Sequence, residues 1–184
     1  DQPVGGCPAG SGADTILFGA GLPPGGTFVL ARTGAGEDAA QTGDLDVTGV
    51  LQVAAPASGT IVVDGNGTDR VFDVLPGARL TLTGVTLRNG NAGGTTAEGV
   101  LVRATGALTM TGGMVTNSAG TGLLVRGTLT LNGTTVGSNG GDGVAIDGGA
   151  GSFTNTSILD NTQGAGVRNT GSGALVFASG YVER

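Results

Sequence analysis

Apolar and polar residues alternate in short pieces along most of the chain. Within residues 99–121 the apolar pieces are Val100-x-Val102, Leu108-x-Met110 and Met114-Val115, and similar pieces recur in the segments that follow. A period of two is typical of β-strands, in which successive side chains point to opposite faces. No apolar stripe with the 3.6-residue period of an α-helix competes with this pattern. The alternation therefore predicts an all-β protein built from short strands.

This pattern recurs at a nearly constant interval in the second half of the chain. Four segments there begin with a glycine, and they cover residues 99–121, 122–142, 143–165 and 166–184. The turns inside a segment are too short for a crossover helix, so three strands form one coil of a solenoid and pair in parallel with the next coil. We therefore expect an all-β, right-handed parallel β-helix of about six coils, with three short strands per coil.

The same alternation continues upstream with longer connections. We expect a single β-helix domain over residues 1–184. Within it we expect a flexible or capping segment at 1–13, N-terminal coils with longer loops at 14–98, and regular coils at 99–184. The two longest loops are predicted at Ala31–Gly43 and Asn91–Glu98.

Composition and charge narrow the functions that such a fold can have. The net charge is −6, lysine is absent and the eight arginines are scattered, so nucleic acid is not an expected partner. No run of apolar residues is long enough for a transmembrane helix, so membrane insertion is not expected. Histidine is also absent, which removes the commonest general base, and we expect no enzymatic activity, cofactor or metal. Cys7, the only cysteine, is expected to be an unpaired thiol, with intermolecular pairing as the alternative.

Asparagines recur where the coils turn. The last three of the set Asn89, Asn117, Asn139 and Asn161 follow one another at equal intervals. Asparagine tolerates a positive φ, and stacked amides can hydrogen-bond along a column of coils. We interpret the four residues as a structural ladder, and an amide-lined ligand site is the alternative.

Two columns of side chains are predicted on the outside of the coils. In the segment Leu80–Thr83 the leucines point inward, so the threonines point outward. The resulting candidate face for binding ice or glycan comprises Thr81, Thr83, Thr109, Thr111, Thr130, Asn132, Thr154 and Thr156. Threonine is also simply favourable on exposed strands, which is the alternative explanation. A second outward column, Leu101, Leu124 and Ala145, is apolar and predicts a partner surface or a covering loop.

Residues 64–69 match only the first part of a calcium-binding loop. Residues Asp64–Asp69 alternate oxygen-bearing side chains with glycine as a calcium loop does, but the twelfth position, where an EF-hand has an acid, is Leu75. A tight turn between strands is therefore expected.

An ion pair between Arg126 and Asp147 on adjacent coils is also predicted.

Part of the chain resembles a known family. The run Gly34–Ala40 followed by Gly43–Val47 resembles bacterial right-handed β-helix repeat surface proteins, the type that often carries an N-terminal Cys-Ser-Leu-Arg-Glu-Ala motif. Residues Val63–Val74 and Leu80–Gly90 carry the same resemblance, which spans roughly residues 14–184. The N-terminal motif itself is missing here. The resemblance implies a secreted or surface-displayed protein and no chemical reaction.

These observations predict a non-enzymatic, extracellular structural β-helix that serves as a bacterial cell-surface stalk, adhesin segment or coat component. One alternative is a subunit that builds an extracellular filament by stacking end to end, so that its partner is itself, because open solenoid ends expose strand edges. The other is a face that binds a surface polysaccharide or ice.

Overall fold

The structure, a computed structural model, describes residues 12–18, 26–34, 36, 38–57, 59–94 and 97–183. Cys7 and most of the predicted segment 1–13 lie outside the described residues. The described residues form twenty β-strands and no helix, and none of them forms a helix able to cross a membrane.

The strands form three sheets that run along the rod. The first sheet contains β1 (Ala13–Leu17), β4 (Val50–Ala54), β7 (Arg79–Thr83), β10 (Ala107–Thr111), β13 (Thr128–Asn132), β16 (Ala150–Thr154) and β19 (Leu175–Phe177). The second contains β2 (Thr27–Val29), β5 (Ile61–Asp64), β8 (Val85–Arg88), β11 (Met114–Thr116), β14 (Thr135–Gly137), β17 (Thr156–Leu159) and β20 (Gly180–Val182). The third contains β3 (Leu45–Val47), β6 (Phe72–Val74), β9 (Val100–Val102), β12 (Leu123–Val125), β15 (Val144–Ile146) and β18 (Val167–Asn169).

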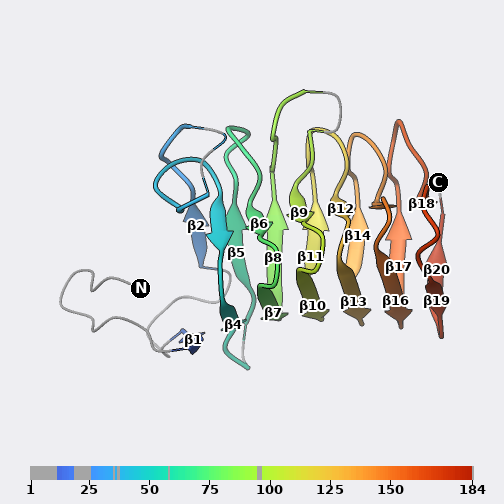
Figure 1. Cartoon of the computed structure of the whole chain (residues 1–184), viewed down its shortest axis with the longest axis horizontal. Helices are drawn as coiled ribbons and strands as arrows, with labels where there is room; N and C mark the ends of the chain where they lie inside the picture. Colours follow the sequence, from blue (N-terminus) through green and yellow to red (C-terminus); the bar gives the residue numbers. More distant parts are fainter. Residues whose placement is uncertain are drawn as a thin grey trace.

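Each strand pairs in parallel with the strand three places later in the chain. Figure 1 shows the strands of successive coils side by side along the long axis, from the N-terminal coils at one end to the C-terminal coils at the other. The predicted all-β parallel solenoid of about six coils, with three strands per coil, is confirmed.

The core is a set of inward columns that run through all three sheets. In the first sheet Leu80, Leu108 and Leu129 stack in register, and each is at most 1% exposed. The neighbouring column places Met110, Leu131 and Phe153 at 0% exposure. Burying one such side chain stabilises the fold by about 1.5–3 kcal/mol, and a single coil has no second apolar layer to cover it. Stacking of coils therefore supplies the stability.

One position breaks the leucine column and shows how the core adapts. Gly151 follows Leu129 in the register, and a Cβ there would lie 2.9 Å from the ring of Phe153. The Phe153 ring fills the space that leucine occupies in earlier coils, and it stacks on Phe177 with ring centroids 4.7 Å apart. The inward volume is thus kept although the residue types change.

The turns between the first and second sheets repeat one backbone conformation. The residue after each strand has a positive φ in four successive coils, at Gly84, Gly112, Gly133 and Asn155, with values of 65°, 64°, 61° and 48°. A left-handed residue reverses the inside-outside alternation across the turn, and glycine and asparagine adopt it at little cost. This turn ends the five-residue strands of the first sheet.

Candidate binding face

The first sheet presents two outward columns rich in hydroxyl groups. Strands β7, β10, β13 and β16 align Thr81, Thr109, Thr130 and Ser152 in one column and Thr83, Thr111, Asn132 and Thr154 in the next. We call these eight residues the threonine face. Parallel strands lie about 4.8 Å apart and outward residues follow at about 6.6 Å, so the side chains form a regular grid.

The threonine face has little charge and clear borders. The third outward column of the same four strands is Arg79, Ala107, Thr128 and Ala150, so Arg79 is the one charged group on the outside of these strands. Beyond the four strands the central column continues with Gln52 on β4 at one side and with Val176 on β19 at the other. The outward residues of the four strands include no aromatic ring and no carboxylate. A sugar would therefore find neither a stacking platform nor a charged hydrogen-bond acceptor here.

Thr156 is not part of this face, and the prediction that placed it there is wrong. It is 2% exposed and is the first residue of β17 in the second sheet. Its hydroxyl donates hydrogen bonds to the carbonyl oxygens of Leu131 at 3.3 Å and Thr154 at 3.1 Å. The turn at Asn155 separates two strands that look continuous in the sequence. Ser152, which the sequence pattern did not indicate, holds the outward position instead.

The predicted asparagine ladder divides into two columns. Asn139 and Asn161 are 0% and 1% exposed, and the side-chain amide of Asn139 donates to Oδ1 of Asn161 at 3.0 Å. Oδ1 of Asn139 accepts the backbone N–H of Ser118 at 3.0 Å, so Ser118 occupies the next position of this column. Both amides also donate to backbone carbonyl groups of the coils. These groups hold the coils together and are not open to a ligand.

Asn89 and Asn117 stand one residue earlier, in the turn itself, so their assignment to the ladder is wrong. Their φ values are 56° and 55°, and the same column continues with Ser138 at 58° and Asp160 at 56°. Strand register causes the difference, because Thr116 pairs with Gly137 and the turn residue Asn117 therefore aligns with Ser138. The asparagines are equally spaced in the sequence, so the sequence alone does not show this shift of one position.

The apolar column on the outside of the third sheet is not a free surface. Leu101, Leu124 and Ala145 are 7%, 5% and 0% exposed and form a buried cluster separate from the main core. The prediction of a partner strip is therefore wrong, whereas burial of the column agrees with the alternative of a covering loop. The column continues with Asp73 on one side and Arg168 on the other.

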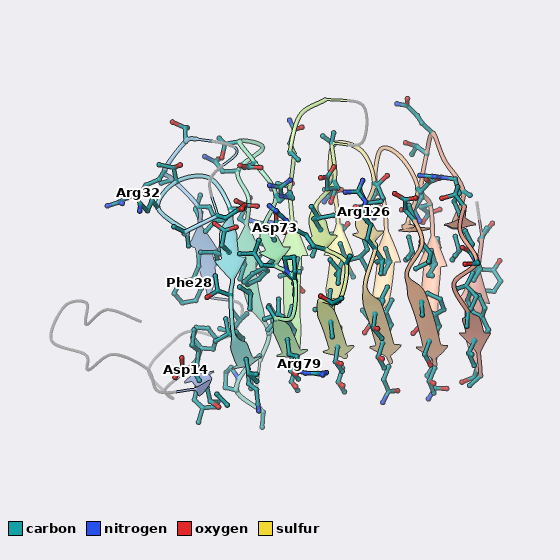
Figure 2. The ribbon with its side chains drawn as sticks, in the orientation of Figure 1. Asp14, Phe28, Arg32, Asp73, Arg79 and Arg126 are labelled. Carbon is teal, nitrogen blue, oxygen red and sulfur yellow. The ribbon has the colours of Figure 1, made fainter. Side chains whose placement is uncertain are left out.

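Arginine side chains connect neighbouring coils through ion pairs. Nε of Arg126 (labelled in Figure 2) lies 3.1 Å from Asp147, which confirms the predicted pair. Both side chains are about half exposed. Arg88 binds Asp64 of the preceding coil at 2.7 Å, and Arg168 binds Asp142. Ion pairs thus connect successive coils in both the N-terminal part and the regular part of the rod.

The turn Asp64–Asp69 is held by hydrogen-bond donors. Asp64 accepts the backbone N–H of Asn66 at 2.9 Å, the amide of Asn89 at 2.9 Å and Nε of Arg88 at 2.7 Å. Burial works to raise the pKa of Asp64, but these three hydrogen bonds outweigh it and hold the pKa below its ordinary value. The Asp64 carboxylate therefore stabilises the turn through hydrogen bonds within the chain, as expected for a tight turn.

A larger ionic network lies at the N-terminal coils around Arg70. The Arg70 guanidinium binds Asp44 at 2.7 Å, Glu98 at 3.2 Å and Asp73 at 3.3 Å. Arg103 also binds Asp73 at 2.8 Å. These acids come from three coils, and sequence reasoning did not bring them together because only the register aligns them.

Asp44 has the most perturbed carboxyl group of this network. Burial raises its pKa, the contact with Arg70 lowers it, and the charges of Asp69 and Asp46 raise it again, to about 6 in total. Asp44 is 3% exposed. The network therefore holds more negative charge than its arginines compensate.

Both ends of the rod carry exposed apolar side chains. Phe177 and Tyr181 are 49% and 55% exposed at one end, and Leu17 and Phe28 are 73% and 41% exposed at the other. On β1, however, Asp14 takes the inward position that leucine holds in the following coils. A charge in that column opposes direct stacking of another coil on this end.

Comparison with protein-family models, with curated proteins and with solved structures found no match to this chain. The fold itself defines the class of this protein, which is the parallel β-solenoid.

Proposed function

We propose that this chain is a non-catalytic structural β-solenoid, a segment of a bacterial surface stalk, adhesin or coat that acts outside the cell. One observation carries the proposal: five arginines, Arg70, Arg88, Arg103, Arg126 and Arg168, each bind an acid of a different coil. The charged side chains are thus used to connect coils rather than to line a reaction site. The resemblance of residues 34–90 to bacterial surface proteins supports the location.

A rod of this kind works through its length and stiffness. Three parallel sheets with a continuous core transmit force along the axis, because each coil is bonded to the next on all three sides. Such a segment separates whatever lies at its two ends by a fixed distance.

Antibody labelling of the source cells tests the proposal. Antibodies raised against the purified chain are expected to label intact cells, and brief protease treatment of the cells should remove the signal. Labelling that appears only after permeabilisation would contradict the surface location. Incubation of the chain with a panel of polysaccharides tests the other half, and release of new reducing ends would show it to be an enzyme.

A second candidate function, binding to ice, is favoured by the threonine face. Its eight residues stay in register over four coils, and the grid is uncharged and free of aromatic rings. Sugar sites in proteins are usually concave with a few convergent polar groups, whereas a periodic grid matches a periodic solid. The methyl and hydroxyl groups of threonine suit contact with ordered water.

Thermal hysteresis measured with a nanolitre osmometer tests this candidate. Thr111→Lys, in the exposed column of the face, should abolish the hysteresis because a long cation prevents flat contact. Thr135→Lys, on the second sheet, is the matched control and should retain it. Absence of hysteresis in the unmodified chain would reject ice as the ligand.

A further inference from the structure

The N-terminal coils concentrate the acidic groups of this protein. Six carboxylates, which we call the acidic cluster, surround the guanidinium groups of Arg70 and Arg103: Asp38, Asp44, Asp46, Asp69, Asp73 and Glu98. Asp44, Asp69, Asp73 and Glu98 are at most 6% exposed. Buried charges are expensive unless they are paired, and two arginines cannot neutralise six acids.

Within this cluster, the carboxylate group of Asp69 is only half satisfied by hydrogen bonds. Asp69 is 2% exposed; its Oδ1 accepts the backbone N–H of Arg70 at 2.7 Å, whereas its Oδ2 is buried without a partner. The other buried aspartates differ, because Asp44 accepts Arg70 and Asp73 accepts both arginines. Asp69 Oδ2 is therefore a buried carboxylate oxygen that no donor of the described residues neutralises.

The unpartnered oxygen faces a second acceptor. A Cβ built on Gly43 would lie 2.5 Å from Asp69 Oδ2 and 2.4 Å from the carbonyl oxygen of Gly34, so both oxygens point to the same side of Gly43. Two oxygen acceptors that converge repel each other unless a hydrogen-bond donor or a cation lies between them. Carboxylate and backbone carbonyl oxygens are the ligands that calcium takes in proteins, at about 2.3–2.6 Å and in flexible geometry.

Neighbouring groups extend this arrangement towards solvent. Asp44 lies near both Asp69 and Asp46, since the charges of both act on its carboxyl group. Carboxylate oxygens of Asp38, Asp46 and Asp73 lie within 4.8 Å of one another, and the Arg103 guanidinium binds two of these acids, Asp38 and Asp73. Asp38 is exposed, so a path from solvent leads to the cluster.

We infer that the acidic cluster binds one calcium ion, with Asp69 Oδ2 and the Gly34 carbonyl oxygen as ligands and Asp44 as the neighbouring carboxylate. Calcium fits better than magnesium because the donors come from two separate loops and include a backbone carbonyl, whereas magnesium demands regular octahedral geometry and keeps its water. The ion joins the loop that contains Gly34 and Gly43 to the turn that contains Asp69.

This linkage fixes the loop over the end of the core. An apolar hollow of about 390 Å³ lies under it, lined by Phe18, Phe28, Leu30 and Leu45 and bordered by Ala40 of the loop. Arg32 is exposed on the same loop and points away from the coils (Figure 2). Proteolysis at Arg32 therefore reports whether the loop is held in place.

Calorimetric titration of the whole chain with calcium chloride after removal of divalent ions is the first experiment. We expect one calcium per chain, and at a hundredfold excess over the dissociation constant we expect the Tm to rise by about 5 °C or more. Sodium chloride of equal ionic strength should have no such effect. Asp69→Asn should abolish the Tm shift, while Asp147→Asn, in the exposed pair of the later coils, should retain it.

Trypsin cleavage gives a readout that needs no variant. Calcium should slow cleavage after Arg32 at least tenfold and leave cleavage after Arg168 unchanged. No heat of binding together with equal cleavage rates would overturn the inference.

Discussion

Removal of the Asn139 side chain tests the division of the asparagines into two columns. In the structure this amide is fully buried, accepts the backbone N–H of Ser118 at 3.0 Å and donates to Asn161 Oδ1 at 3.0 Å. Asn139→Ala leaves the Ser118 N–H buried without an acceptor, at about 1–3 kcal/mol. Asn161 Oδ1 keeps a donor, because the backbone N–H of residue 139 still reaches it at 3.2 Å.

A small cavity adds to this loss, since the packed coils relax only in part. We therefore expect Asn139→Ala to lower the free energy of unfolding by about 2–4 kcal/mol. Asn117→Gly is the matched control. Asn117 is exposed with a φ of 55°, a conformation that glycine adopts freely. The free energy of unfolding of the Asn117→Gly variant should therefore stay within about 0.5 kcal/mol of that of the unmodified chain.

Urea denaturation followed by far-UV circular dichroism measures both variants against the unmodified chain. Equal m-values are required, so that the change in midpoint reports stability alone. A loss below about 1 kcal/mol for Asn139→Ala would refute the reasoning from buried hydrogen bonds. An equal loss for Asn117→Gly would refute the register that separates the two columns.

Three further predictions follow from the core and the ionic network. The pKa of Asp44 is raised to about 6 in the folded chain, so its contribution to stability is full below about pH 4 and is lost as the pH rises to about 6. Urea titrations at several pH values without calcium measure this loss. The free energy of unfolding of Asp44→Asn should vary less with pH over this range than that of the unmodified chain. Arg103→Ala removes the short contact of 2.8 Å to the fully buried Asp73 and leaves only Arg70, at 3.3 Å, to pair with it, so this change should cost at least about 2 kcal/mol. Arg126→Ala breaks an exposed pair and should cost about 1 kcal/mol or less. Gly151→Leu should lower the free energy of unfolding by about 1–3 kcal/mol, because the new side chain crowds the Phe153 ring. The additional change Phe153→Leu should recover part of this loss. If the effects of the two changes simply add, the two side chains do not compete for the same space.

The architecture of this protein follows from its amino-acid sequence alone. The alternation of period two identifies strands, and a regular repeat with short turns leaves parallel stacking of coils as the way to bury the apolar face. Inward and outward positions within each strand also follow from the alternation, which is why Thr81, Thr109 and Thr130 could be assigned to one column without a structure.

Features that depend on exact register and on contacts between distant segments required the tertiary structure. A shift of one position separates Asn117 from Asn139, and a left-handed turn at Asn155 moves Thr156 from the surface to the interior. Leu101 appears outward by its pattern, but it is buried. The arginines that bind the acidic cluster connect residues up to 65 positions apart, as in the contact of Arg103 with Asp38. Such contacts are set by how the coils stack, and no local pattern in the chain encodes them.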